Sequence, residues 1–263
     1  MIFLQHEKGW DNMLTKTRQK EILKLLENRG SVTLQELKDH LNTSESTIRR
    51  DLNTLDAQGK LVKVFGGAVA ADNMSIRDEQ VSRREEKNLE EKRLIARYAA
   101  SLIQDDDFVY LDAGTTTGCM LDYISDATTA VFVTNAPSHA QKLARKGMEV
   151  ILLGGRLKQS TEAVVGEEAC RQIEKFNFSL GFLGSNGVSE RSGFSTPDQD
   201  EAMVKKRAIE RIHRCFVLCD HTKFYKVSPI SFAKLEDAVV LTDSAPQGNF
   251  QEMPNIVEIS EDE

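Results

Sequence analysis

Short apolar runs recur after residue 107 of this 263-residue sequence, and the residues that follow them include glycines, residues with hydroxyl or amide side chains, and one lysine. The most prominent stretch is Asp112-Ala-Gly-Thr-Thr-Thr117. Backbone N–H groups and hydroxyls at a helix start can bind a phosphate. Lys223 could add a positive charge, and the side chains of Asp112 and Asn135 could bind the hydroxyls of a sugar. The sequence therefore predicts a polar pocket for a phosphorylated, hydroxyl-rich ligand.

The elements that position these residues are predicted from hydrophobic patterning. Apolar runs typical of buried strands cover residues 108–111, 131–133, 150–153, 180–183, 216–218 and 238–241. Helical stretches between them cover residues 117–124, 138–146, 167–176 and 197–212, and an earlier one begins near residue 87. Strands that alternate with helices predict an α/β domain with a mainly parallel sheet covered by helices on both faces.

Ligands of open α/β sheets bind beyond the carboxyl ends of the strands. Small or polar residues follow each predicted strand, so these ends are expected to form one pocket. Its predicted members are Asp112, Gly114, Thr115, Thr116, Thr117, Asn135, Gly154, Gly155, Asp220 and Lys223. A simpler interpretation is that such residues only make turns and helix caps. That interpretation fits any single loop but fits the whole set less well.

The first seventy residues contain three short helical patterns. The first covers about residues 18–28. The second begins with Thr33-Leu-Gln-Glu36, a capping box that satisfies the first backbone donors of a helix. After a tight break, Ser44 is the expected cap of the third helix. Two helices joined by so short a break predict a helix-turn-helix at about residues 32–51.

The polar side of the third helix predicts contacts with double-stranded DNA. Arginine forks bind guanine edges in the major groove, and hydroxyls at a helix start bind phosphate. Residues 61–68 alternate in polarity and contain a glycine pair, which predicts a hairpin wing. The residues expected to contact DNA are Ser44, Ser46, Thr47, Arg49, Arg50, Lys60, Lys63, Gly66 and Gly67. The alternative from pattern alone is a small helical domain with a solvated basic face.

Charge is distributed unevenly along the chain. The net charge is −7, but residues 1–70 carry eleven Lys and Arg against nine Asp and Glu, so they hold +2 and the remainder holds −9. A modestly basic module joined to an acidic body fits a DNA-binding protein whose other domain has a different ligand. The four scattered cysteines are typical of a reducing cytosol. With no apolar run of eighteen residues and no signal-peptide core, we expect a cytoplasmic protein without a membrane partner.

The expected domain organisation has four parts. Residues 1–14 are predicted to be a disordered extension, with Met13 as a candidate natural start. Residues 15–70 are predicted to form the winged helix-turn-helix domain. Residues 71–86 are predicted to be a mostly extended, charged linker, and residues 87–263 the ligand-sensing domain.

Two sets of residues resemble the DeoR family of bacterial transcriptional regulators. The first set is Thr47-Ile-Arg-Arg-Asp-Leu52, Leu55, Gly59-Lys-Leu61 and Phe65-Gly-Gly-Ala68. The second set is Asp112-Ala-Gly-Thr-Thr-Thr117, Val133-Thr-Asn135, Leu153-Gly-Gly155, Phe182-Leu-Gly184, Gly193, Glu201-Ala and Asp220 with Lys223-Phe224. Together they span nearly all of residues 15–243.

The resemblance implies a sensor domain with the ribose-5-phosphate isomerase-like fold and an effector pocket for a phosphorylated sugar, which would include Glu201. It further implies a homodimeric or homotetrameric repressor of a sugar uptake or catabolism operon, without enzyme activity or a cofactor. Two positions depart from the family pattern. Phe65 stands where members usually carry His or another aromatic residue, which puts an imidazole–phosphate contact of the wing in doubt. Ser179 stands near a common Asp, so either effector choice or a local hydrogen bond differs.

Two other functions compete with this interpretation. One is a sugar-phosphate isomerase with a DNA-binding appendage, which would need a positioned carboxylate base. Asp112, Asp220 and Glu201 are candidates, but nothing in the sequence distinguishes a base from a hydroxyl-binding group. The other is a regulator that responds to a partner protein while its pocket stays empty.

Two further signals favour structural roles. Cys215 and Cys219, with His213 and His221 nearby, could be considered for a metal site, but buried core thiols are favoured and no metal is expected. The basic run Lys205-Lys-Arg207 is expected on a solvated helix face, with Glu201 and Glu210 as its partners.

Overall fold

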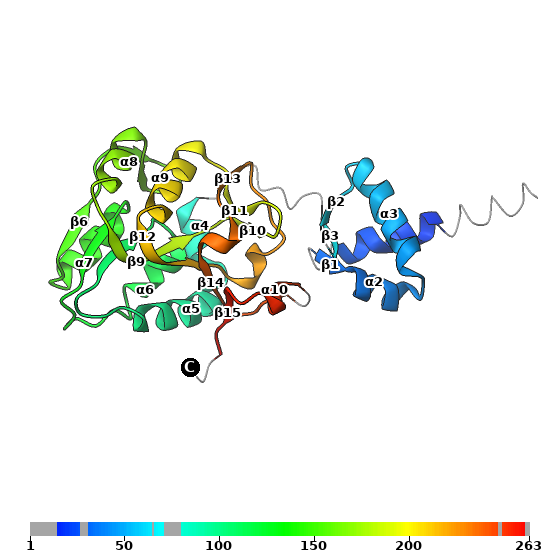
Figure 1. Ribbon diagram of the computed structural model, residues 1–263, viewed down its shortest axis with the longest axis horizontal. Helices are drawn as coiled ribbons and strands as arrows, with labels where there is room; N and C mark the ends of the chain where they lie inside the picture. Colours follow the sequence, from blue (N-terminus) through cyan, green and yellow to red (C-terminus); the bar gives the residue numbers. More distant parts are fainter. Residues whose placement is uncertain (1–14, 27–30, 65, 71–79, 247–248, 261–263) are drawn as a thin grey trace, which may run out of the picture. The chain divides into compact units, whose positions relative to one another are not determined.

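The computed structural model describes residues 15–26, 31–64, 66–70, 80–246 and 249–260 (Figure 1). The chain divides into two compact units, of which the first contains Met1–Met74 with Gln247–Asn249 and the second contains Ser75–Pro246 with Phe250–Glu263. The predicted extension at 1–14 and most of the predicted linker lie outside the described residues. Within the described part, no helix has the length and apolar character needed to cross a membrane.

The first unit is a winged helix-turn-helix. A helix over residues 15–26 precedes the elements β1 (Ser31–Thr33), α2 (Leu34–Leu41), α3 (Glu45–Ala57), β2 (Leu61–Val64) and β3 (Gly67–Ala70). The three strands form an antiparallel sheet in the order β1-β3-β2. The side chains of Ile22, Leu37, Ile48 and Leu52 are fully buried between the helices, as the predicted stripes require.

Both predicted helix caps are confirmed. The Thr33 hydroxyl accepts a hydrogen bond from the Glu36 N–H at 3.1 Å, and the Glu36 carboxylate accepts one from the Thr33 N–H at 2.7 Å. The Ser44 hydroxyl accepts a bond from the Thr47 N–H at 3.3 Å and begins α3. Side-chain oxygens thus satisfy donors that the first turn of a helix leaves without partners.

The second unit is built on a seven-stranded parallel sheet. Its order is β15-β14-β12-β9-β4-β5-β6, and every neighbouring pair is parallel. The strands are β4 (Phe108–Leu111), β5 (Val131–Thr134), β6 (Val150–Leu152), β9 (Phe178–Gly184), β12 (Ile212–Leu218), β14 (Val239–Thr242) and β15 (Ile256–Glu258). All but β15 were predicted, and the predicted α/β class is confirmed.

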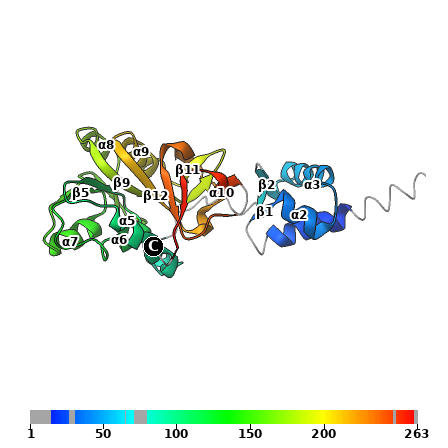
Figure 2. The same cartoon turned by 60° about the horizontal axis from the view of Figure 1, so that its bottom comes forward.

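Helices cover both faces of this sheet (Figure 2). On one face α5 (Leu89–Ser101), α6 (Thr115–Met120) and α7 (Pro137–Arg145) pack on a core that includes Val109 and Phe132. On the other face α8 (Glu167–Ile173) and α9 (Gln199–Ile209) pack on a core that includes Tyr110 and Val133. Successive strand residues therefore enter opposite cores, which explains why the strands are apolar throughout.

Several short elements were not predicted. These are α4 (Val81–Glu86), α10 (Asn249–Glu252), a hairpin of β7 (Arg156–Lys158) and β8 (Ala163–Val165), and a small antiparallel sheet of β10 (Gly187–Ser189), β11 (Gly193–Thr196) and β13 (Ile230–Ala233). The helix predicted to continue to residue 212 ends at Ile209, because Ile212 begins β12. The helix predicted over 117–124 begins at Thr115 and ends at Met120.

The segment predicted to be an extended linker contains α4, so that expectation was wrong for residues 81–86. Its sequence lacks an apolar stripe, and none of its residues is buried. Contacts from elsewhere hold it instead. The Val81 N–H donates to the Ser160 carbonyl at 3.2 Å, and the Lys92 ammonium donates to the carbonyls of Arg84 and Lys87 at the end of the helix.

Candidate effector pocket and nucleic-acid interface

The exposed side of α3 carries the predicted DNA-contacting residues. The side chains of Ser44, Ser46, Arg49 and Arg50 are exposed, and Thr47 is half-buried. Arg49 forms an ion pair with Glu45 one turn earlier, at 2.7 Å. Both side chains are more than half exposed, at 52% and 55%, so water screens the pair. The Arg49 guanidinium can therefore exchange Glu45 for a phosphate or a base edge at little cost.

Asp51 has a role that sequence analysis missed. Its carboxylate is only 3% exposed and accepts hydrogen bonds from Arg18 and Gln19 on the first helix. These bonds fix the first helix against α3. The sequence did contain a sign of this role, because Asp51 is an acidic residue next to Leu52 on the side of α3 that packs inward.

The predicted wing is a hairpin attached to α3. The Lys63 ammonium donates to the Asn53 side chain at 2.6 Å, and the Lys63 N–H donates to Asp56 at 3.0 Å, whereas Lys60 is exposed. Gly66 has a φ of +80°, which favours glycine. At Gly67 a Cβ would lie 2.1 Å from the Val32 carbonyl oxygen, so β3 can approach β1 only without a side chain there. Phe65 lies outside the described residues.

In the second unit, the carboxyl ends of the strands meet α4 and α5 around one pocket, which we call the strand-end pocket. Six of its lining residues are cationic and two are acidic. The cations are Arg84, Lys87, Lys92, Lys205, Lys223 and Lys226, and the acids are Glu201 and Asp220. Of the other predicted residues, Gly114, Thr115 and Thr116 line it. The predicted convergence of different strand ends is thus observed for these residues.

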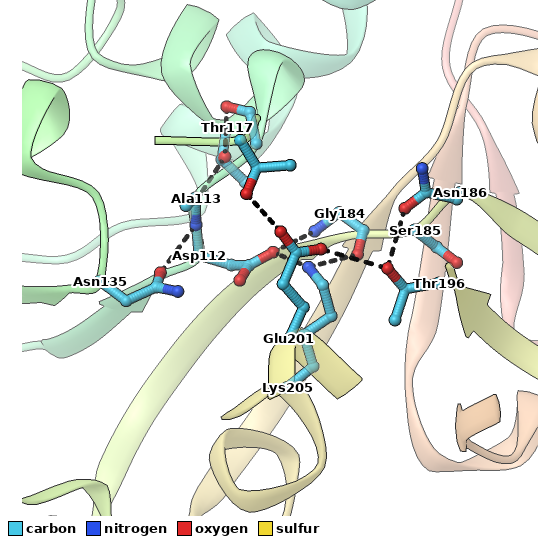
Figure 3. A network of polar contacts seen from close by, with 12 residues as sticks. Asp112, Ala113, Thr117, Asn135, Gly184, Ser185, Asn186, Thr196, Glu201 and Lys205 are labelled. Carbon is cyan, nitrogen blue, oxygen red and sulfur yellow. Dashed lines mark hydrogen bonds and ion pairs between the residues drawn. The ribbon is translucent and has the colours of Figure 1, made fainter. Parts of the chain in front are cut away.

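A buried ion pair forms the floor of this pocket (Figure 3). The Lys205 ammonium, from α9, bonds to the carboxylate of Asp112 at the end of β4, and the two side chains are 7% and 2% exposed. Lys205 also donates to the Gly184 carbonyl at 3.1 Å, and the Gly184 N–H donates to Asp112 at 3.1 Å. The three groups therefore join β4, β9 and α9.

Glu201 lies one turn before Lys205 and forms a separate network (Figure 3). Its carboxylate accepts hydrogen bonds from the hydroxyls of Thr161 and, at 3.2 Å, Thr196. The Lys158 ammonium lies 3.3 Å from the same carboxylate. Glu201 is 7% exposed, so these partners stabilise a charge that burial alone would disfavour.

Asp220, after β12, connects the sheet to the start of α5. Its carboxylate accepts hydrogen bonds from the Asn88 amide at 2.9 Å and from the Thr222 N–H at 3.0 Å, and the Lys223 ammonium lies 3.9 Å away. Burial acts to raise the pKa of Asp220. The Lys223 charge and the hydrogen bonds from Thr222 and Asn88 outweigh it and lower the pKa overall. Asp220 is therefore an anion at neutral pH.

Lys92, on α5, is a pocket residue that sequence analysis missed. It is 4% exposed, and its ammonium donates to the carbonyls of Lys87, at 2.5 Å, and Arg84. Burial lowers its pKa, although the Asp220 charge opposes this. Within the described residues its hydrogen bonds go to neutral carbonyls, so the positive charge has no direct carboxylate partner there.

Family models match both units. Residues 18–74 match the DeoR-like helix-turn-helix domain, and residues 87–244 match the DeoR C terminal sensor domain. The chain belongs to the DeoR family of transcriptional regulators. It is a DNA-binding regulator and not an enzyme, so the isomerase alternative was wrong.

The DeoR-family chain is similar to curated regulators over almost its whole length. It is 40% identical over 243 residues to a protein described as the uncharacterized HTH-type transcriptional regulator FruR of Bacillus subtilis, covering 91% of this chain and 96% of that protein. It is 32% identical over 244 residues to the lactose phosphotransferase system repressor of Staphylococcus aureus, covering 91% and 96%. Among solved structures, ribose 5-phosphate isomerase A of Methanocaldococcus jannaschii gives a TM-score of 0.40 at 14% identity, covering 53% of this chain and 56% of that one.

Five predicted pocket residues of this DeoR-family chain lie behind or away from the pocket surface. Asp112 is 1% exposed beneath Lys205. The Thr117 hydroxyl donates to the carbonyls of Asp112 and Gly114. Asn135 accepts from the Ala113 N–H at 2.8 Å and donates to the Val164 carbonyl at 3.3 Å. Gly154, at the end of β6 with Gly155, bonds to Gln172 at 2.9 Å. These residues shape the ends of the strands. None of them is among the described residues that line the strand-end pocket.

The expectation that Lys205 is solvated was wrong. Lys205 faces the sheet edge, and its partner is Asp112 rather than Glu201. Arg207 does pair with Glu210, at 2.9 Å, as expected. Ser179 lies near the start of β9, at the opposite end of the strand from the pocket, where it accepts from the Phe108 N–H at 3.0 Å and donates to Asp107 at 2.6 Å. This departure therefore concerns a local hydrogen bond.

The structural interpretation of the two neighbouring cysteines is confirmed. Cys215 and Cys219 are buried free thiols in the core. Burial raises the pKa of each to about 12, so both stay protonated at neutral pH.

Proposed function

We propose that this regulator is a cytoplasmic repressor of genes for sugar uptake or catabolism, and that a phosphorylated sugar in the strand-end pocket controls its binding to an operator. The names of its relatives support a sugar system, since one represses a lactose phosphotransferase system. The observation that carries the proposal is the charge of the pocket.

The cations of the pocket exceed its acids even after its ion pairs are considered. Asp112 neutralises Lys205, and Asp220 lies near Lys223. Lys92 and Arg84 also line the pocket, and in the described region the buried Lys92 ammonium bonds only to carbonyls. A phosphate dianion would supply the missing negative charge and accept charge-assisted hydrogen bonds. The hydroxyls of Thr115 and Thr116 and the carboxylate of Glu201 offer partners for a sugar.

The DNA-bound form that we propose is symmetric. A helix-turn-helix places its second helix in the major groove, and dimers bind two half-sites about one helical turn apart. In this chain α3 is that helix, with Arg49 and Arg50 directed at bases and Ser44, Ser46, Thr47, Lys60 and Lys63 at the backbone. A homodimer or homotetramer would therefore bind a palindromic operator.

The test is an operator-binding titration with a panel of phosphorylated and free sugars, for the wild-type protein and Lys223→Ala. We expect one sugar phosphate to change operator affinity and the free sugar to have no effect. Losing one charge-assisted hydrogen bond corresponds to ~1.5–3 kcal/mol, or roughly ten- to a hundredfold in effector affinity. Operator affinity without effector should be unchanged in the variant.

Two outcomes would contradict the proposal. Free sugars that act as well as phosphorylated ones would remove the role of the phosphate. A wild-type protein that responds to no sugar phosphate would favour the partner-protein alternative, in which the pocket stays empty. Lys206→Ala is the matched control, because Lys206 is an exposed lysine on α9.

A further inference from the structure

A second cavity adjoins the strand-end pocket on the side of α6 and α7, and we call it the side cavity. Arg84, Ala113, Gly114, Thr115 and Thr161 belong to the walls of both. The two cavities are therefore neighbouring compartments of one cleft. Their chemistry differs, since the side cavity combines apolar residues such as Leu89 and Leu121 with Ser138, His139 and Lys142.

His139, in the first turn of α7, is the unusual group of the side cavity. It is 7% exposed, and its Nδ1 atom is buried without a hydrogen-bond partner in the described part of the chain. The ring lies against Gly118, where a Cβ would be 3.0 Å from Nε2. A buried nitrogen without a partner lowers the stability of the fold. This cost is accounted for if a ligand supplies the missing partner.

The partner that His139 needs is a neutral hydrogen-bonding group. Burial lowers the pKa of His139 to about 4, so the imidazole is neutral at pH 7. One nitrogen of a neutral imidazole donates a hydrogen bond and the other accepts one. A sugar hydroxyl can both donate and accept, so it can satisfy either nitrogen, whereas a phosphate dianion can only accept.

We infer that the side cavity holds the hydroxyl-bearing carbon chain of the effector, with one hydroxyl hydrogen-bonded to the imidazole of His139. This inference rests on the proposed function, which places the phosphate in the strand-end pocket. The division follows from charge, since the cationic compartment takes the anion and the compartment with a neutral imidazole takes the hydroxyls. His139 is then a specificity-determining residue, because only a ligand long enough to enter both compartments reaches it.

The experiment is isothermal titration calorimetry with the full-length protein and two variants. His139→Leu removes both ring nitrogens, and His139→Asn keeps a polar atom near the position of Nδ1. The probes are glucose 6-phosphate, fructose 1-phosphate, fructose 6-phosphate, glycerol 3-phosphate and inorganic phosphate. His213→Leu is the control, because His213 is an exposed histidine near the amino end of β12.

We expect His139→Leu to weaken the best six-carbon probe by about tenfold or more, and glycerol 3-phosphate and inorganic phosphate by less than about threefold. His139→Asn should retain most of the affinity, and His213→Leu all of it. The ligand-free melting temperature of His139→Leu should stay the same or rise, because an unsatisfied nitrogen has been removed.

Three results would overturn the inference. The six-carbon probe could bind His139→Leu as tightly as wild type. All probes could weaken equally, which would assign His139 to the phosphate or to the fold. The ligand-free protein could lose stability in His139→Leu, which would show that the nitrogen has a structural partner. If wild type binds no sugar phosphate, the proposed function itself fails, and this inference fails with it.

Discussion

The exposed side of α3 and the floor of the strand-end pocket use the same chemistry in opposite environments. The side chains of Arg49 and Glu45 are 52% and 55% exposed, whereas those of Lys205 and Asp112 are 7% and 2% exposed. Water and salt screen the first pair, so its charges are available to another partner. The second pair has exchanged its hydration for contacts within the protein, so it is part of the fold.

This comparison separates the two tasks of a regulator. A surface that binds DNA needs cations that change partners readily, because the operator must compete with water and counterions. A pocket that detects a small molecule needs groups held in fixed positions, because an unfixed pocket would lose affinity in ordering itself. If burial divides the charged residues in this way, substitutions of buried charges should change stability, and substitutions of exposed charges on α3 should change operator affinity.

The largest effect is expected for Lys205→Ala. The variant leaves the Asp112 carboxylate buried without its cation, and breaking a buried pair in this way costs about 3–5 kcal/mol. Urea unfolding of the full-length protein measures the loss. Lys206→Ala, one residue along α9 and exposed, should be within about 0.5 kcal/mol of wild type. Equal stability of the two variants would contradict the assignment of Lys205 to the floor of the pocket.

The second effect concerns pH. The pKa of His139 is about 4 in the folded state, against an ordinary value of 6.5. Between these values the unfolded chain binds a proton that the folded chain does not, so the free energy of unfolding falls as pH decreases from 6.5 to 4. The contribution is on the order of 3 kcal/mol at the acid end. His139→Leu should lose this part of the slope, and a variant with the wild-type slope would contradict a buried, neutral imidazole.

The third effect is on operator binding and not on stability. Arg50→Ala, or Arg49→Ala, should remove about 1–3 kcal/mol of operator affinity where the side chain contacts a base. The free energy of unfolding should change by less than about 0.5 kcal/mol, since both side chains are exposed. A salt titration of operator binding distinguishes base contacts from phosphate contacts, because only the latter change the salt slope. Wild-type affinity in the double variant across that titration would show that α3 does not contact the operator.

The distance along the chain between interacting residues explains which features could be predicted from the sequence. Thr33 and Glu36 are three residues apart, and Ser44 caps the helix that it precedes, so the interactions are local and their signal lies within one turn. The apolar strands were also predictable, because burial on both faces leaves a continuous hydrophobic run. The three-residue strands β7, β8, β10 and β15 were missed, since so few residues show no periodicity. β6 is as short, but it was predicted because its apolar run continues to Leu153.

The partner of Lys205 could not be predicted for the opposite reason. Local pattern gave it Glu201, four residues earlier on the same helix, whereas its partner is 93 residues away in the chain. Lys92 was missed in the same way, because its partners are carbonyls that any lysine could use. Helix spacing describes a solvated face well, but it contains no information about which face meets the end of a sheet. The buried cations of this site are therefore visible only in three dimensions.

The smallest effect is expected for Glu45→Gln on α3. Its carboxylate pairs with Arg49 in the solvent, so stability should change by less than about 0.5 kcal/mol. Operator affinity should instead rise, because the substitution frees Arg49 and removes a negative charge from the side that we propose faces the phosphates. One unit charge at about 4 Å in water is worth ~1 kcal/mol, which corresponds to about fivefold. The gain should disappear in high salt, where such interactions are screened. The opposite result would be a Glu45→Gln protein that loses as much stability as Lys205→Ala while its operator affinity stays constant. That result would show that exposure does not distinguish the charged residues that bind DNA from those that stabilise the fold.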